Sequence, residues 1–145
     1  MSDYKIPKAE FYRIYNKVPR LCVDIIINSD EGILLSKRNI SPAKGKWHIP
    51  GGTVFFDETL EQAAKRISKE ELGLDIELVK TLGIIEYLTK EEIFGRPISI
   101  VFLARIVSGV LKLDKQSTEI GFFKNPPENM PIDQRKFLEN NLKNL

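Results

Sequence analysis

One segment of the chain, residues 57–72, has the pattern of an amphipathic helix that must pack one face against a larger body. Asp57 or Thr59 can cap its start, and Thr59 with Gln62 fits a capping box. Gly73 is the expected C-terminal stop. The apolar residues recur at helical spacing and fall on one stripe: Leu60, Ala63, Ala64, Ile67 and Leu74.

Two carboxylates interrupt the expected apolar stripe of this helix. At about 100° per residue, Glu71 lies roughly 20° from Leu60, and Glu70 lies roughly 80° to one side. A carboxylate that faces a core is costly unless it is paired or bound to a metal. The pattern therefore favours a hard cation such as Mg²⁺, bound by these carboxylates. The alternative is a surface helix whose two carboxylates point to water.

The rest of the chain is predicted to form a mixed sheet with a helix on each face, an α/β sandwich. We expect helices at residues 7–17 and 132–142 in addition to the central one. The expected strands span residues 21–28, 33–37, 47–49, 76–88 (bent at Gly83), 98–107, 110–113 and 120–124. Because no repeat or linker interrupts this order, residues 1–145 are expected to form a single domain.

Composition excludes several classes of protein. The chain has 145 residues and a formal net charge of +2, so it carries no strong electrostatic indication of a nucleic-acid partner. No apolar run approaches the roughly 20 residues of a membrane span, and residues 1–16 do not read as a signal peptide. The one cysteine, Cys22, lies in an apolar strand and is expected to be inert. Its isolation is typical of the reducing cytoplasm.

The spacing around the helix resembles the signature of the Nudix hydrolase family. That signature is Gly, five residues, Glu, seven residues, then Arg-Glu-aliphatic-any-Glu-Glu-any-Gly-aliphatic. The matching residues follow without a gap: Gly52, Glu58, Arg66, Glu70, Glu71, Gly73 and Leu74. Two positions depart, because Ile67 stands in place of the Glu after the Arg and Ser68 in place of an aliphatic residue. The resemblance implies the Nudix α/β/α sandwich with a mixed β-sheet.

The resemblance also implies roles for the matching residues. Glu70 and Glu71 would be metal ligands together with the backbone carbonyl of Gly52, for Mg²⁺ or alternatively Mn²⁺. Glu58 and Arg66 would hold the loop and the helix in shape and so serve catalysis. Ile67 removes a third carboxylate, so we expect fewer bound metals than in the usual site, and a weakened or altered reaction stays open.

Residues 20–75 look most like the branch of GDP-mannose mannosyl hydrolases, which shares an aliphatic and then a small hydroxyl residue after the Arg. Asp24 matches an Asp that recognises the sugar in that branch. Arg38 matches an Arg that stabilises the departing diphosphate. The alternatives are a simple strand position for Asp24 and a surface charge for Arg38.

The second half of the chain departs from that branch. Where those enzymes carry a His general base, this chain has Ser117, and an unassisted Ser is a poor base near neutral pH. Glu119 resembles the Glu before a strand that acts as base or metal ligand in phosphorus-attacking relatives; a plain strand-edge charge is its alternative. The only histidine, His48, is expected to face solvent, and a place near the metal is its alternative.

The resulting expectation is a Mg²⁺-dependent hydrolase of a nucleoside diphosphate linked to another moiety, most of all a GDP-mannose-like nucleotide sugar. The expected binding partner is this small-molecule nucleotide, and neither a nucleic acid nor a membrane is expected to bind. Alternatives are a (d)NTP or ADP-ribose pyrophosphatase and a non-catalytic nucleotide-binding module. The N-terminal helix, with Phe11, Tyr12 and Tyr15, would either cover the core or contribute to a homodimer. Specificity is expected from the loops at residues 39–46, 90–97 and 114–118.

Overall fold

A computed structural model describes residues 5–41, 43–89, 94–113, 115 and 117–145 of the chain. Its helices are α1 (Lys8–Tyr15), α2 (Leu60–Leu72) and α3 (Ile132–Asn141), and a short 3₁₀ helix (Leu142–Asn144) follows α3. The strands are β1 (Arg20–Ser29), β2 (Gly32–Arg38), β3 (Trp47–His48), β4 (Gly51–Thr53), β5 (Leu74–Glu86), β6 (Pro97–Gly109) and β7 (Ser117–Phe123).

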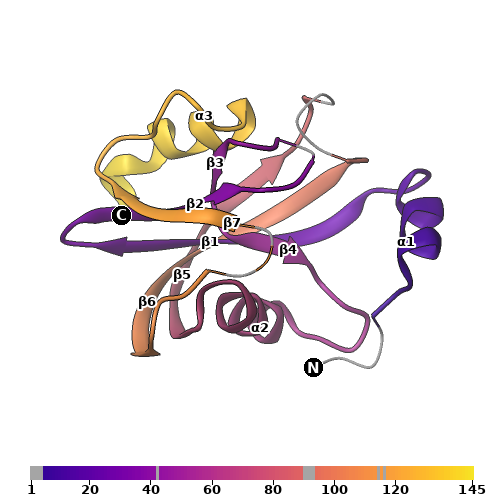
Figure 1. Ribbon diagram of the computed structural model, residues 1–145, viewed down its shortest axis with the longest axis horizontal. Helices are drawn as coiled ribbons and strands as arrows, with labels where there is room; N and C mark the ends of the chain where they lie inside the picture. Colours follow the sequence, from indigo (N-terminus) through magenta and orange to yellow (C-terminus); the bar gives the residue numbers. More distant parts are fainter. Residues whose placement is uncertain (1–4, 42, 90–93, 114, 116) are drawn as a thin grey trace.

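The strands form a mixed sheet in the order β3-β2-β1-β6-β5, with β4 also paired to β1 and β7 to β2. The β1–β6 pair is parallel, and the other pairs are antiparallel. Figure 1 shows α2 and α3 on opposite sides of the strands, and α1 beyond one end of them. The predicted α/β sandwich with a mixed sheet is confirmed.

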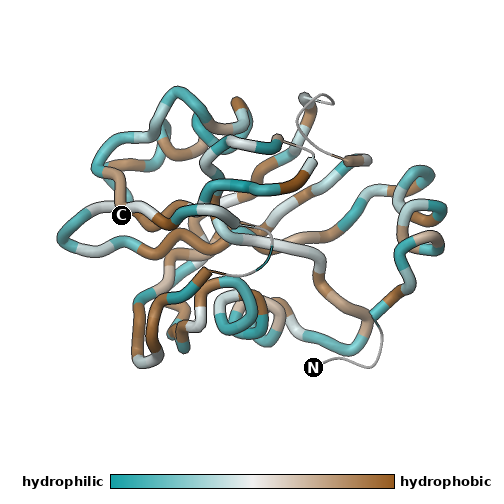
Figure 2. Tube along the Cα trace, viewed as in Figure 1, coloured by the Kyte–Doolittle hydropathy of each residue, from teal (hydrophilic) through white to brown (hydrophobic). Residues whose placement is uncertain are grey.

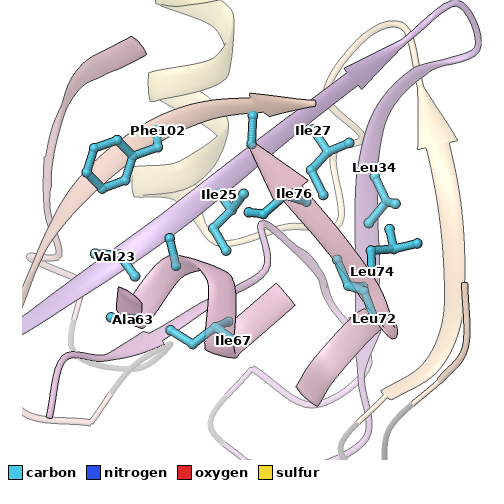
Figure 3. Packing of buried hydrophobic residues seen from close by; sticks show 12 residues of the cluster. Val23, Ile25, Ile27, Leu34, Ala63, Ile67, Leu72, Leu74, Ile76 and Phe102 are labelled. Atoms are coloured by element: carbon cyan, nitrogen blue, oxygen red, sulfur yellow. The ribbon is translucent and has the colours of Figure 1, made fainter. Parts of the chain in front are cut away.

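Apolar burial explains the layers. Figure 2 shows the apolar stretches gathered in the strands between α2 and α3. Figure 3 shows Ala63 and Ile67 of α2 near Val23 and Ile25 of β1, while Leu72 lies beside Leu74 of β5. A second cluster packs on the other face, where α3 contributes its fully buried Leu138. Each helix therefore covers one face of the sheet and excludes water from it.

Strand β1 is buried on both faces over residues 22–27, so it does not alternate between polar and apolar residues. Central strands covered by helices on both sides typically read as continuous apolar runs. In its first half β1 pairs with β4, with Val23 opposite Gly52 and Asp24 opposite Gly51. The core strand thereby fixes the position of strand β4 and its two glycines, which precede α2.

Four sequence predictions about local structure need correction. The expected strands did not include residues 51–53, which form β4. Helix α2 begins at Leu60 because Thr59 is its N-cap, so residues 57–59 precede the helix. Residues 110–113 form no strand; the N–H of Lys112 instead donates to the carbonyl oxygen of Leu72 at 2.9 Å, at the end of α2. His48 does not face solvent, since only 9% of it is exposed. The predicted bend at Gly83 coincides with a shift in the β5–β6 register.

Within the residues that the structure describes, no helix has both the length and the apolar character that crossing a bilayer requires.

Candidate active site

Helix α2 is fixed at both ends by its own sequence. The side chain of Thr59 accepts the N–H of Gln62 at 3.1 Å, and the side chain of Gln62 accepts the N–H of Thr59 at 2.9 Å. This is the predicted capping box. At the other end Gly73 adopts the left-handed conformation (φ 73°), which places N–H groups on the last carbonyls of the helix. The caps fix where the last turn, with Glu70 and Glu71, begins and ends.

Glu58 and Arg66 form a mostly buried clamp between the loop and α2. Arg66 donates to both carboxylate oxygens of Glu58, at 2.5 and 3.0 Å, and to the carbonyl oxygen of Thr53 at 2.9 Å. Its guanidinium carbon lies 3.9 Å from the centre of the Phe55 ring. Such a planar fork fixes direction as well as distance. The clamp therefore orients the segment that leads from β4 into α2.

The clamp also sets the protonation state of Glu58. Burial alone would raise the pKa of Glu58, but hydrogen bonds from Arg66 and from the Phe55 N–H outweigh it and lower that pKa. Glu58 is therefore ionised at neutral pH and is engaged by Arg66. The structure brings these two expected residues together, and their contribution to catalysis stays a prediction.

Glu70 and Glu71 lie on the last turn of α2 and line one cleft with Gly52 and Ile67. Nη1 of Arg66 holds the exposed Glu70 carboxylate at 3.3 Å. Glu71 is half-buried, and its Oε2 atom is shielded from solvent. The helical period predicted Glu71 near the middle of the apolar stripe, whereas the structure places it half-buried, where the cleft meets the core.

The two departures from the family signature have structural roles here. Ile67 is 3% exposed and belongs to the core under α2, with its Cδ1 atom close to the open side of Gly52. Ser68 is fully buried, and its hydroxyl donates to the carbonyl oxygen of Leu74 at 3.1 Å. A third carboxylate at position 67 would therefore replace a packed apolar side chain. Accordingly, no group of three or more His, Cys, Asp or Glu side chains suited to a metal occurs among the described residues.

Basic residues line the same cleft, which has a volume of about 640 Å³. Arg38, at the end of β2, is the one that sequence reasoning selected. Arg20, Lys5 and Lys115 also line the cleft and were missed, because nothing in their local sequence distinguishes them from surface charges. Arg20 is fixed by a 2.9 Å hydrogen bond from its Nη1 to the hydroxyl of Thr53. The cleft thus combines a carboxylate pair with cationic walls, an arrangement that suits a polyanion bound with a divalent cation.

Asp24 lies beneath Gly51 of β4 and is not among the residues that line the cleft. Tyr87 donates to its Oδ2 atom at 2.5 Å, and Gln134 of α3 donates to the Tyr87 oxygen at 2.9 Å. The side-chain oxygen of Gln134 accepts the N–H of Ile49 at 2.8 Å. Burial raises the pKa of Asp24 to about 6, although the hydrogen bond from Tyr87 acts in the opposite direction. These hydrogen bonds connect Gln134 of α3 with Asp24 of β1 and with Ile49, just ahead of β4. The sugar-binding role of Asp24 stays a prediction.

His48 is neutral at physiological pH. Burial, followed by the positive charge of Arg38, lowers its pKa to about 3. Its Nε2 atom lies 3.3 Å from the hydroxyl of Ser36. A group with this pKa cannot exchange protons efficiently near pH 7. His48 lines the cleft as a neutral wall residue.

Glu119 lies on β7 opposite Lys37 of β2, and the two charged groups are 3.5 Å apart. Its side chain is 59% exposed and does not line the cleft with Glu70 and Glu71. Its role as base stays a prediction. Of the expected specificity loops, residues 42, 90–93, 114 and 116 lie outside the described residues.

Comparisons with known proteins bear on the family and the fold of this chain. The family model of the NUDIX domain matches residues 18–142. This chain belongs to the Nudix family. The Nudix hydrolase is 32% identical over 140 residues to the low-salt glycan biosynthesis protein Agl8 of Haloferax volcanii, covering 93% of this chain and 90% of that protein. It is 38% identical to an ADP-ribose pyrophosphatase of Methanocaldococcus jannaschii, covering 88% of this chain and 75% of that one.

The fold is shared with solved Nudix structures. A MutT NUDIX hydrolase from Burkholderia pseudomallei superposes with a TM-score of 0.76 at 29% identity, covering 84% of this chain and 97% of that one. The predicted family, fold and hydrolase class are therefore confirmed for this Nudix hydrolase.

Proposed function

We propose that this Nudix hydrolase cleaves nucleoside diphosphates linked to a second moiety, with nucleotide sugars as the substrate class and Mg²⁺, or alternatively Mn²⁺, as cofactor. One observation carries the proposal: Glu70, Glu71 and Gly52 line the same cleft as Arg38 and Arg20. A diphosphate needs both a divalent cation and positively charged side chains to offset its negative charge.

The donor set fits one hard cation. Glu70, Glu71 and the Gly52 carbonyl would supply oxygen ligands, which Mg²⁺ prefers. Glu71 supports this fit because its shielded Oε2 lies at the core border, where a bound cation would offset the cost of burying a charge. Ile67 keeps the number of carboxylates at two. When bound, the ion would neutralise the diphosphate and stabilise the charge that develops on it.

The side chains of the chain would then divide the remaining tasks. Arg38 would hold the departing phosphate, since its guanidinium can donate two parallel hydrogen bonds. Glu58 and Arg66 would keep the turn and α2 in register. We retain Glu119 as the proposed base. Glu70 is its competitor for that role, since Glu70 lines the cleft while Glu119 pairs with Lys37 outside its lining.

We propose attack of water at phosphorus, which releases a nucleoside monophosphate and a sugar phosphate. Two features support phosphorus: the missing loop His and the likeness to a relative named as an ADP-ribose pyrophosphatase. Attack at the sugar carbon, which releases a nucleoside diphosphate and free sugar, is the second candidate. It draws on the likeness of residues 20–75 to the mannosyl hydrolases. The relative named for glycan biosynthesis supports a nucleotide sugar in either case.

Product analysis in ¹⁸O-labelled water tests the proposal, with GDP-mannose, ADP-ribose and dGTP as substrates. Label in the phosphate of the products supports attack at phosphorus, and label in free sugar supports attack at carbon. Release of pyrophosphate from dGTP alone would replace the nucleotide-sugar proposal by a MutT-like triphosphate activity.

Variants test the assigned residues. Glu71→Gln is expected to lower kcat by about 10²-fold or more and to weaken Mn²⁺ binding measured by titration. Glu61→Gln is the matched control, because Glu61 lies on the wet face of the same helix and pairs with Lys65. Unchanged activity and Mn²⁺ affinity in Glu71→Gln would refute the metal site. Glu119→Gln should lower kcat by about 10²-fold or more if Glu119 is the base. Glu70→Gln removes a proposed metal ligand and should also weaken Mn²⁺ binding; a loss of kcat with unchanged Mn²⁺ affinity would make Glu70 the base instead.

A further inference from the structure

Helix α1 contributes to the cleft although it lies outside the stretch that the family model matches. The match begins at residue 18, whereas α1 spans Lys8–Tyr15. Its Phe11 and Tyr12 line the cleft, together with Lys5 just before the helix. None of the residues of α1 is buried. The helix is therefore not held by the core, and its contacts at the cleft need an explanation of their own.

Phe11 and Tyr12 form an aromatic cluster with Phe94, which also lines the cleft. The Tyr12 and Phe94 rings lie 4.6 Å apart at 89°, and the Phe11 and Tyr12 rings lie 5.8 Å apart at 86°. These edge-to-face arrangements are favourable for aromatic pairs. Tyr12 is nevertheless 43% exposed, so the cluster leaves aromatic surface uncovered beside the cleft.

Arg20 connects this aromatic cluster to strand β4. Its guanidinium carbon lies 5.5 Å from the centre of the Phe11 ring, and it donates to the carbonyl oxygen of Phe94 at 3.5 Å. Through Nη1 it also binds the hydroxyl of Thr53, the residue after Gly52. Arg20 thus contacts both the aromatic cluster and strand β4, which carries the proposed metal ligand Gly52. The cluster is held at a fixed place relative to the diphosphate end of the cleft.

We infer that Phe11, Tyr12 and Phe94 form the nucleobase-binding end of the cleft, which makes α1 a specificity element for the nucleoside part of the substrate. This inference rests on the proposed function and names the part of the substrate that α1 would bind. A base offers a flat π face, and aromatic side chains bind such faces by stacking. With the diphosphate bound beside Glu70 and Glu71, the base would stack on the aromatic cluster. The second moiety of the substrate would lie on the other side of the diphosphate.

Binding titrations with guanosine diphosphate and with inorganic pyrophosphate, both in Mg²⁺, separate the base from the diphosphate. Tyr12→Ala and Tyr12→Leu should weaken binding of guanosine diphosphate by about tenfold or more, because stacking contributes strongly per base. Both variants should leave the affinity for pyrophosphate within about twofold of the wild type. Tyr12→Phe keeps the ring and should bind like the wild type.

Tyr15→Ala is the matched control. Tyr15 belongs to the same helix and contacts Phe11 at 4.8 Å between ring centres, but it does not line this cleft. It should leave both affinities unchanged. Circular dichroism verifies that each variant is folded, and Tyr12→Leu serves if Tyr12→Ala is not.

Three outcomes would overturn the inference: unchanged affinity for guanosine diphosphate in both Tyr12 variants, an equal loss for both ligands, or no binding of guanosine diphosphate by the wild-type protein. A wild-type protein that binds guanosine diphosphate through Tyr12 but does not hydrolyse nucleotide sugars would refute the proposed function alone. Hydrolysis that is insensitive to Tyr12 would refute the aromatic site alone.

Discussion

Asp24 gives a prediction about stability and pH. It is 5% exposed, and burial raises its pKa from an ordinary value of 3.8 to about 6. Each pKa unit corresponds to about 1.4 kcal/mol, so the ionised form of Asp24 lowers the free energy of unfolding by about 3 kcal/mol relative to the protonated form. Between pH 4 and 6 the folded protein binds a proton that the unfolded chain has already lost. The stability that Asp24 contributes is therefore complete below about pH 4 and is lost as the pH rises through about 6.

The perturbation is Asp24→Asn, which keeps the shape of the side chain and removes the titration. Urea unfolding of both proteins at several pH values from 4 to 8 measures the effect. Because all other groups are shared, the difference in unfolding free energy isolates Asp24. We expect the variant to gain about 3 kcal/mol relative to the wild type between pH 4 and pH 7, and this relative gain to stay constant above pH 7.

Tyr87→Phe supplies the control for the direction of the effect. It removes the hydroxyl that binds Oδ2 of Asp24 and accepts from Gln134. The loss should be larger at pH 8 than at pH 4, because the ionised carboxylate needs the donor more than the neutral acid does. Parallel stability curves for the wild type and Asp24→Asn across pH 4–7 would refute the reasoning, since Asp24 would then titrate alike in the folded and unfolded chains.

Two further predictions concern helix α2. Arg66→Lys should lower the free energy of unfolding by about 2 kcal/mol or more, because lysine cannot reproduce the two bonds to Glu58 and the bond to the Thr53 carbonyl; denaturant unfolding measures it, and a loss under about 0.5 kcal/mol would contradict the clamp. Gly73→Ala should lower it by more than about 1 kcal/mol, since φ is +73° and a Cβ would lie 2.5 Å from the carbonyl oxygen of Val110. Thermal melting checks the second variant, and a melting temperature equal to that of the wild type would exclude the strained C-cap.

The sequence allowed helix α2 to be predicted because its signals are local. Thr59 and Gln62 lie three residues apart, and Gly73 is the C-cap, so capping chemistry marks both ends of α2, although Asp57 was a second candidate for the first of them. The helical period then placed Glu71 on the core-facing side of α2, where the structure leaves it half-buried. Residues within one helix keep a fixed angular relation, which makes such an inference independent of the rest of the fold.

The strand residues could not be predicted in the same way. Asp24 and His48 lie on strands that are covered by neighbouring elements, and β1 shows no alternation that would distinguish a wet face from a core face. Gln134 binds the Ile49 N–H across 85 positions of sequence, and only the folded chain reveals that pair. Glu119 faces Lys37 because of the β2–β7 register, which depends on a similarly distant pairing.

The Gln134 bond to Ile49 has a consequence for synthesis of the protein. Residues 50–52 leave the ribosome well before α3 does, yet the N–H of Ile49, just ahead of them, finds its acceptor only on α3. A nascent chain that ends before residue 134 therefore has its carboxylates and glycines but lacks the bond that fastens Ile49 ahead of β4. The segment that leads into α2 should accordingly be fixed in place only after α3 has emerged and docked.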